Sequence, residues 1–91
     1  MAIMTAELSL ETWRKRLLWR ASHRGIKEMD ILVGGYAVRE LPTMTAADLL
    51  IFESLMDVPD QDLMAYATGQ AAVPAAHDGV ILRGILAFRP A

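Results

Sequence analysis

The stretch ASHRGIKEMD, residues 21–30, lies between two segments whose apolar residues recur at helical spacing, and it decides the fold. The segment before it predicts a helix over 10–22, with Ser9 as its N-cap. The segment after it predicts a second helix over 26–39. Gly25 is the expected stop between the two, because glycine reaches the left-handed conformation without steric cost. The two apolar stripes are Leu10, Trp13, Leu17 and Ala21, then Ile26, Met29, Val33 and Tyr36.

Two adjacent glycines, Gly34 and Gly35, interrupt the second predicted helix. Each glycine inside a helix costs up to about 1 kcal/mol relative to alanine. The pair therefore has two interpretations. Either another helix approaches closely at this point, or the helix is locally loose.

The remainder of the chain predicts three more short helices, over 46–57, 61–68 and about 77–87, and no strand pattern competes with them. The first begins at Thr45 and Asp48, which together resemble a capping box. Asp60 is the expected cap of the next helix, and Gly69 is its expected end. A loop around Pro74 precedes the last helix, and Pro90 limits its continuation.

These elements predict an all-α fold, a compact bundle of about five short helices. With 91 residues the chain is long enough for one small domain and too short for two independent cores. We expect residues 1–9 to be a flexible N-terminus and residues 10–89 to form the single domain.

The composition excludes several classes of protein. A hydrophobic fraction of 54% argues against disorder, and the absence of cysteine excludes disulfides and thiolate metal sites. The longest nearly apolar run, ILVGGYAV at 31–38, is far shorter than the roughly 20 residues that cross a bilayer. The first residues lack the basic start and long apolar segment of a secretory signal. We therefore expect a cytoplasmic protein.

The charges are distributed unevenly, although the net charge is only −2. A basic group occupies the first third of the chain, and an acidic group without lysine or arginine follows from residue 40 to residue 78. Either a partner meets the basic surface, or two helix faces attract each other within the fold. The basic residues are Arg14, Lys15, Arg16, Arg20, Arg24 and Lys27; the acidic residues are Glu40, Asp48, Glu53, Asp57, Asp60, Asp62 and Asp78.

Residues that would carry catalysis are not arranged for it. His23 and His77 each occur alone, so no pair has the spacing of metal ligands. The glycine pair follows no predicted strand, so a dinucleotide fingerprint is excluded. The sequence therefore predicts neither an enzyme nor a metal site nor a bound cofactor.

Nucleic acid binding is the alternative function. The segment WRKRLLWRASHRGIK, residues 13–27, interleaves basic residues with Trp13 and Trp19, which suit phosphates and stacked bases. The acidic second half of the chain would repel a polyanion, and the sequence pI is about 5.5. We therefore expect no nucleic acid partner and keep this function as the alternative.

Arg24, Gly25 and Glu28 form the main candidate site, and their residue types permit two interpretations. Arg24 and Glu28 can form an i,i+4 ion pair of the less favourable polarity, worth a few tenths of a kcal/mol at most. In that case the three residues only close a corner between helices. Alternatively, the corner displays a guanidinium, a bare backbone and a carboxylate for docking onto a partner.

The segment RGIKEMD, residues 24–30, resembles the RGxxE signature of the succinate dehydrogenase FAD assembly factors. Three further segments agree with that family: RKRLLWRASHRG before the signature, FESLMDVPDQDLMAYATG after it, and VILRGILAF near the end. The resemblance spans about residues 10–88. The chain departs from the family pattern at Tyr66, where tryptophan is common, and at Gly34 and Gly35, where bulkier residues are usual.

The resemblance implies a five-helix assembly chaperone without a reaction of its own. Such proteins bind the flavoprotein subunit of succinate dehydrogenase, and in bacteria often that of fumarate reductase, and promote covalent attachment of FAD to a histidine of that subunit. It also implies a docking role for Arg24, Gly25 and Glu28, and for Asp30. We expect a monomer that inserts in no membrane and holds no cofactor, since the chain has no phosphate cradle.

Overall fold

The fold is all-α, as predicted, in a computed structural model that describes the backbone of residues 2–90 and the side chains of residues 9–90. No strand occurs in that range. The elements in chain order are α1 (Ala2–Ser22), α2 (Lys27–Glu40), the 3-10 turn η1 (Leu41–Thr43), α3 (Ala46–Met56), α4 (Asp60–Ala67) and α5 (Val80–Ala87).

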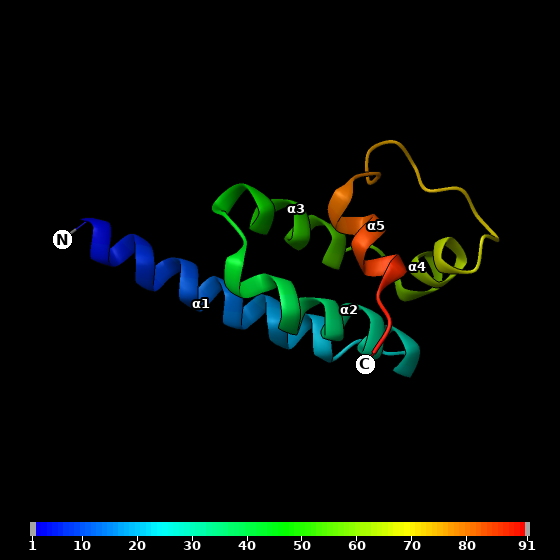
Figure 1. The fold of residues 1–91 in the computed structure, drawn as a ribbon, viewed down its shortest axis with the longest axis horizontal. Coiled ribbons are helices and arrows are strands. Elements are labelled where there is room, and N and C mark those ends of the chain that lie inside the picture. Colours follow the sequence, from blue (N-terminus) through cyan, green and yellow to red (C-terminus); the bar gives the residue numbers. More distant parts are fainter. Residues whose placement is uncertain (1, 91) are drawn as a thin grey trace.

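Helices α1 and α2 form an antiparallel hairpin, and the other helices pack on one side of it (Figure 1). Helix α1 contacts both α2 and α3, while α5 contacts α2, α3 and α4. The short α4 lies at the end of the bundle where the chain turns from α1 into α2. A loop of about a dozen residues then connects α4 to α5. This arrangement places the turn between α1 and α2 close to the start of α4.

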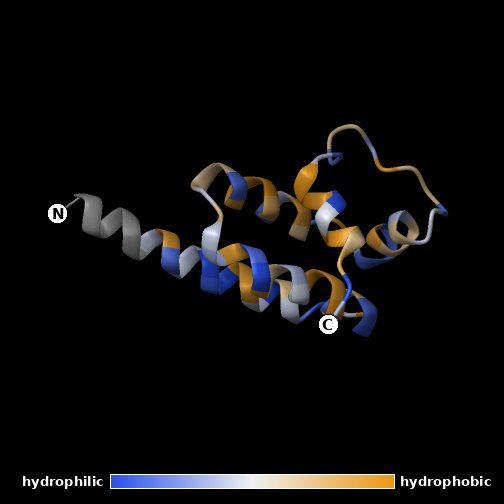
Figure 2. Cartoon of the chain, viewed as in Figure 1, coloured by the Kyte–Doolittle hydropathy of each residue, from blue (hydrophilic) through white to orange (hydrophobic). Residues whose placement is uncertain are grey.

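The core is built from apolar residues of every helix, and no charged or polar residue is fully buried among the described side chains. The most apolar helices are α3 and α5, whereas hydrophilic residues concentrate on α1 and at the start of α2 (Figure 2). Burying one leucine or phenylalanine side chain contributes about 1.5–3 kcal/mol. The largest side chains with almost no exposure are Phe52, Leu17, Met29, Leu49, Leu55, Leu63, Leu82, Ile85 and Val33.

The glycine pair of α2 marks close contacts, which was the first of its two interpretations. A Cβ on Gly34 would lie 3.2 Å from Oγ of Ser22 and 3.3 Å from the carbonyl oxygen of Ala21. Gly34 therefore lets α2 approach the last turn of α1. A Cβ on Gly35 would overlap the ring of Phe88, which covers α2 from the C-terminal segment. The departure at Tyr66 is also accommodated, since this side chain packs against the core.

The predicted start of the first helix was wrong. Helix α1 begins at Ala2, so Ser9 lies inside it and is not an N-cap. Ile3 and Ala6 continue the spacing of Leu10 and Trp13, and the N-cap residue type at Ser9 concealed this. The side chains of residues 1–8 lie outside the described part, and the flexibility of residues 1–9 stays a prediction.

Two other helix starts also differ from the prediction. Helix α4 begins at Asp60 itself, with Pro59 as the N-cap residue, so Asp60 is the first helical residue and not the cap. Helix α5 begins at Val80, because the fully extended Gly79 (φ 177°, ψ 179°) interrupts any helix that includes residues 77 and 78. Those two residues instead donate their backbone N–H groups to the carbonyl of Pro74, at 2.9 and 3.1 Å.

The remaining helix ends agree with the sequence pattern, with one exception. Thr45 and Asp48 form the predicted capping box at α3. Gly69 has a φ of 77° and follows the end of α4 as predicted. Gly25, however, is not left-handed, since Gly69 alone has a positive φ in residues 2–90. The first helix therefore ends at Ser22 without a left-handed glycine.

None of the helices in the described range combines the length and the hydropathy that crossing a membrane requires.

Candidate partner-binding corner

The Arg24 side chain fastens the turn between α1 and α2 to the turn between α3 and α4. Its Nε atom lies 2.6 Å from Oδ1 of Asp60. Its Nη1 and Nη2 atoms donate to the carbonyl oxygens of Met56 at 2.8 Å and Val58 at 2.6 Å. The side chain is only 9% exposed. All three nitrogens of the guanidinium are therefore used inside the fold.

The sequence around Asp60 explains why an arginine fits there. The last carbonyl groups of a helix have no partner within the helix, and Met56 and Val58 are at the end of α3 and just beyond it. A planar guanidinium can reach both carbonyls and a carboxylate at once, which an ammonium group cannot do. Asp60 is in the first turn of α4, where the helix dipole favours an anion. We call this arrangement of Arg24, Asp60, Met56 and Val58 the arginine clasp.

Backbone groups of the same turn complete the corner. The N–H of Gly25 donates to Oδ2 of Asp60 at 2.9 Å, so the Asp60 carboxylate binds two consecutive residues of the turn. The N–H of Arg24 donates to Oδ1 of Asp30 at 2.5 Å. Asp30 is partly buried in the first turn of α2. Both carboxylates therefore fix the turn in one shape.

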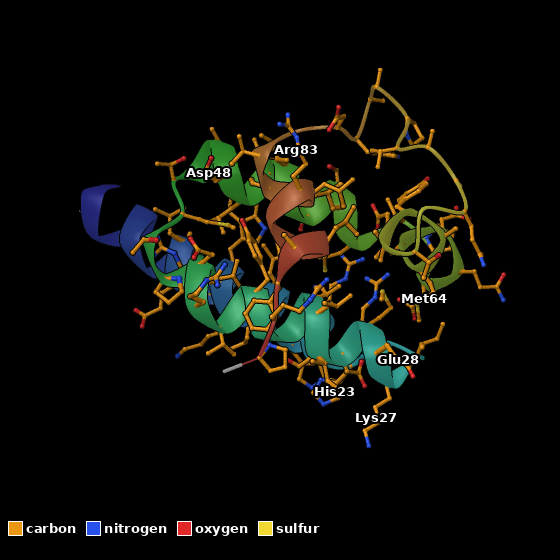
Figure 3. The ribbon with its side chains drawn as sticks, turned by 45° about the vertical axis from the view of Figure 1, so that its right-hand side comes forward. His23, Lys27, Glu28, Asp48, Met64 and Arg83 are labelled. Carbon is orange, nitrogen blue, oxygen red and sulfur yellow. The ribbon has the colours of Figure 1, made fainter. Side chains whose placement is uncertain are left out.

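Glu28 is exposed and lies beside Lys27 at the start of α2 (Figure 3). Its carboxylate makes no ion pair with any described residue, so the i,i+4 pair with Arg24 is not formed. The expectation that the corner displays a guanidinium was therefore wrong. The Arg24 guanidinium is largely buried because three acceptors within the fold bind it. The expectation of a displayed carboxylate and bare backbone holds for Glu28 and Gly25.

The fold does not require a glycine at position 25. The residue is exposed, its φ is outside the left-handed region, and a Cβ would lie 3.6 Å from Oδ2 of Asp60, an ordinary contact. Gly34, by contrast, touches the backbone of α1. Packing among the described residues therefore does not explain the glycine at position 25.

The uneven charge distribution is partly neutralised within the fold. Arg20 pairs with Asp57 at 2.8 Å, and Arg24 pairs with Asp60. Trp13 donates to the Glu53 carboxylate at 3.2 Å. The attraction between helix faces therefore accounts for two of the basic residues. Arg24 is no longer available to nucleic acid phosphates, which weakens the alternative function, whereas Arg20 stays 40% exposed in a surface pair.

Catalytic or metal-binding groups are not gathered at the corner. Within residues that the structure describes, no three histidine, aspartate or glutamate side chains are placed to hold a metal ion. His23 stacks on Trp19, with ring centroids 4.3 Å apart, and its Nδ1 lies 2.7 Å from the Trp19 carbonyl oxygen. His77 is partly buried in the loop before α5.

Asp60 is the residue that the sequence pattern assigned to a different role. It was interpreted as a helix cap, and its actual partner, Arg24, is 36 residues earlier. No local spacing carries that information.

Comparison with known proteins places this corner in a wider context. A family model described as flavinator of succinate dehydrogenase matches residues 15–89. The FAD assembly factor SdhE of Acetobacter pasteurianus is 41% identical over 69 residues, covering 76% of this chain and 63% of that protein. The mitochondrial succinate dehydrogenase assembly factor 2 of Yarrowia lipolytica is 43% identical over 58 residues, covering 64% of this chain and 40% of that protein.

A more distant relative has the same description. The mitochondrial succinate dehydrogenase assembly factor 2 of Dictyostelium discoideum is 30% identical over 74 residues, covering 81% of this chain and 52% of that protein. The chain thus spans less than two thirds of the length of these curated relatives. The residues that the family model matches, 15–89, cover the positions of the arginine clasp and all helices from the second half of α1 onward.

Proposed function

This chain belongs to the Sdh5 family of succinate dehydrogenase flavinators, and from this premise we propose that it is an assembly chaperone for flavin attachment. Its client is the flavoprotein subunit of succinate dehydrogenase, and its action promotes the covalent attachment of FAD to that subunit. The names of the curated relatives, FAD assembly factor and succinate dehydrogenase assembly factor 2, support this proposal.

The proposed docking role rests on one observation, which is that Glu28 and Gly25 are both exposed at the same corner. Both lie at a turn that the arginine clasp and Asp30 hold in one shape. A rigid turn loses little conformational entropy on binding, so contacts made there convert into affinity more completely. In this proposal Glu28 and Gly25 touch the client, while Arg24 and Asp30 position them.

The chaperone acts by selecting a conformation of its client. A partner that binds one state more tightly than another shifts the population toward that state. The reacting groups belong to the flavin and to the client, and this chain supplies binding and orientation. It therefore needs no catalytic side chain of its own.

The finer parts of the proposal concern the range of clients and the setting. The flavoprotein subunit of fumarate reductase is a second client, the chain works as a monomer, and it acts in the cytoplasm. Pull-down of each subunit with the tagged chain, followed by light scattering of the complex, tests the first two points.

The main experiment measures covalent flavin in the client. The client subunit is incubated with FAD and wild-type chain or a variant, and flavin fluorescence is then read on a denaturing gel. Glu28→Gln removes the charge with little change of shape and is expected to lower the covalent flavin. The matched control is Asp78→Asn, an exposed carboxylate before α5 on the other side of the bundle. Equal flavin with wild type and Glu28→Gln would contradict the role of Glu28.

A further inference from the structure

Three apolar side chains are exposed on the outer side of the hairpin formed by α1 and α2. Leu18 of α1 is 36% exposed, and Ile31 and Val38 of α2 are 43% and 64% exposed. Ile31 and Val38 are seven residues apart, so they lie two turns apart on one face of the helix. That face is opposite the one that buries Met29 and Val33 in the core. No packing within the described chain explains why these residues are apolar.

A groove of about 340 Å³ lies between α1 and the end of α2 on this outer side. At Gly34 the second helix packs against Ser22 of α1. One helical turn further along α2, Val38 lines the groove together with Leu18 of α1. Its lining is mostly apolar, and its volume is in the range of common ligand and side-chain pockets. We call this feature the outer groove.

The rim of the outer groove is more basic than acidic. Arg14, Lys15 and Glu11 line it. Arg14 donates through Nη2 to the Met44 carbonyl at 2.8 Å, while its buried Nε has no acceptor among the described atoms. Lys15 is exposed and makes no ion pair with a described residue. The rim therefore suits an occupant that presents an apolar side chain together with a carboxylate.

The outer groove continues the surface that holds the docking corner. Lys27, Ile31 and Val38 share one stripe of α2, and Glu28 precedes Ile31 by a single turn. Figure 3 shows Lys27 and Glu28 on the edge of the molecule opposite Asp48 and Arg83. From Glu28 to Val38 the helix rises about 15 Å. One partner can therefore cover both features without contacting α3 or α5.

The size of the corner also calls for a second contact area. A stable interface buries about 800 Å² on each partner and contains an apolar centre. Gly25 and Glu28 offer a backbone patch and a carboxylate but no large apolar side chain. The strip from Ile31 to Val38, together with Leu18, supplies the missing apolar surface next to them.

We propose that the flavoprotein client seats an apolar, carboxylate-bearing segment in the outer groove, in addition to its contact at Glu28 and Gly25. This inference rests on the proposed function, since it names a second contact for the same client. Leu18 and Val38 receive the apolar side chain, and the exposed Lys15 receives the carboxylate.

Binding of the purified client subunit to surface-immobilised chain tests the groove. Val38→Glu places a charge in the groove at a position that the fold leaves exposed, and we expect its Kd to rise at least about tenfold. The matched control is Leu50→Glu on α3, where the leucine is 60% exposed, and its Kd is expected to stay within about twofold of wild type. Circular dichroism confirms that each variant keeps its helices.

A second pair of variants tests the charge. Lys15→Glu reverses a rim charge and is expected to weaken binding, whereas Arg16→Glu, on another side of α1, is expected to change the Kd less. A photoreactive phenylalanine analogue at position 38 is expected to crosslink to the client, and the same analogue at position 50 is expected not to.

The outcomes separate the two proposals. If the wild-type chain neither binds the client nor raises its covalent flavin, the proposed function fails and the groove contact fails with it. If wild type binds and Glu28→Gln binds less well, but Val38→Glu binds like wild type, only the groove contact is overturned. Crosslinking from position 50 in place of position 38 would also overturn it, because the client would then lie on α3.

Discussion

The Nε atom of Arg24 lies 2.6 Å from Oδ1 of Asp60, and this contact joins two turns that are 36 residues apart in the chain. The same guanidinium satisfies two carbonyl groups at the end of α3. Within the five residues 24–28, the Arg24 side chain is therefore largely buried, whereas the Glu28 side chain is exposed. Substitutions at the two positions should therefore have different effects on stability and on binding.

Replacing Arg24 should destabilise the fold, and replacing Glu28 should not. Arg24→Ala leaves Oδ1 of Asp60 and two carbonyl groups without their donor, and losing one partner of a buried ion pair costs about 3–5 kcal/mol. Glu28→Ala changes an exposed side chain and should alter the free energy of unfolding by less than about 0.5 kcal/mol. Urea unfolding followed by circular dichroism measures both. Equal stability of the two variants would contradict the arginine clasp.

Arg24→Lys should recover only part of the lost stability. The ammonium group keeps the charge beside Asp60 but cannot reach three separate acceptors in the plane that the guanidinium occupies. We expect its free energy of unfolding to lie between those of wild type and Arg24→Ala in the same urea experiment. A lysine variant as stable as wild type would show that charge alone holds the corner.

A series of side chains at Gly25 should separate folding from docking. Gly25→Ala adds a Cβ in ordinary contact with Asp60, so its stability should stay within about 1 kcal/mol of wild type and can even increase, because alanine restricts the unfolded chain. Covalent flavin in the client should fall from alanine to glutamine to tryptophan, because each larger side chain keeps the client further from the turn. Thermal unfolding and the flavin gel are measured on the same samples. Unchanged flavin across the series would remove Gly25 from the contact.

Tyr36 should make the protein less stable at alkaline pH. Burial raises the pKa of its phenol above the usual 10.0, and the Glu40 carboxylate adds to the increase, while Arg39 lowers it. Its contribution to stability is fully present below the unfolded-state pKa of about 10 and is lost as pH rises through the higher folded-state pKa, because the unfolded chain releases the proton first. Tyr36→Phe has no such proton. Its free energy of unfolding should therefore fall less steeply above pH 10 in urea titrations, and parallel pH curves would contradict this.

Gly34→Val should loosen the hairpin. The new methyl groups would enter space where a Cβ already lies 3.2–3.3 Å from α1 atoms, two of them backbone, which cannot swing aside. Overpacking of this kind costs about 1–3 kcal/mol. Ile31→Val is the control, since it places the same residue at an exposed position of α2 and should change stability far less. Both are measured by thermal unfolding.

The helices were predictable wherever a local signal existed. The bounds of α2 and α3 follow from apolar spacing and, for α3, from the capping box at Thr45. The start of α1 was missed because Ser9 offered an N-cap signal inside the helix, and the start of α5 because Gly79 takes an extended conformation. The glycine pair left a close contact and a loose helix as alternatives, and it did not identify the contact partners, Ser22 and Phe88.

The sequence predicted that Arg24, Gly25 and Glu28 lie together at the turn between the first two helices, but their orientation only in part. Glu28 and Gly25 are exposed there, and the docking role of the corner stays a prediction. Whether an arginine turns inward depends on acceptors elsewhere in the fold, and here they are on the turn between α3 and α4. Sequence spacing indicates only which residues are neighbours within one helix, so it suggested an ion pair between Arg24 and Glu28. In the structure Arg24 instead contacts Asp60 and the carbonyl groups at the end of α3 and just beyond it.

The long reach of the arginine clasp also determines when the turn acquires its shape during synthesis. Residues 24 to 28 leave the ribosome well before Asp60, and until Asp60 emerges neither the guanidinium nor the Gly25 N–H has its carboxylate. A nascent or truncated chain that ends before α4 therefore has the signature in its sequence without the geometry in space. The turn therefore reaches its final shape only after α4 has been synthesised and has packed against it.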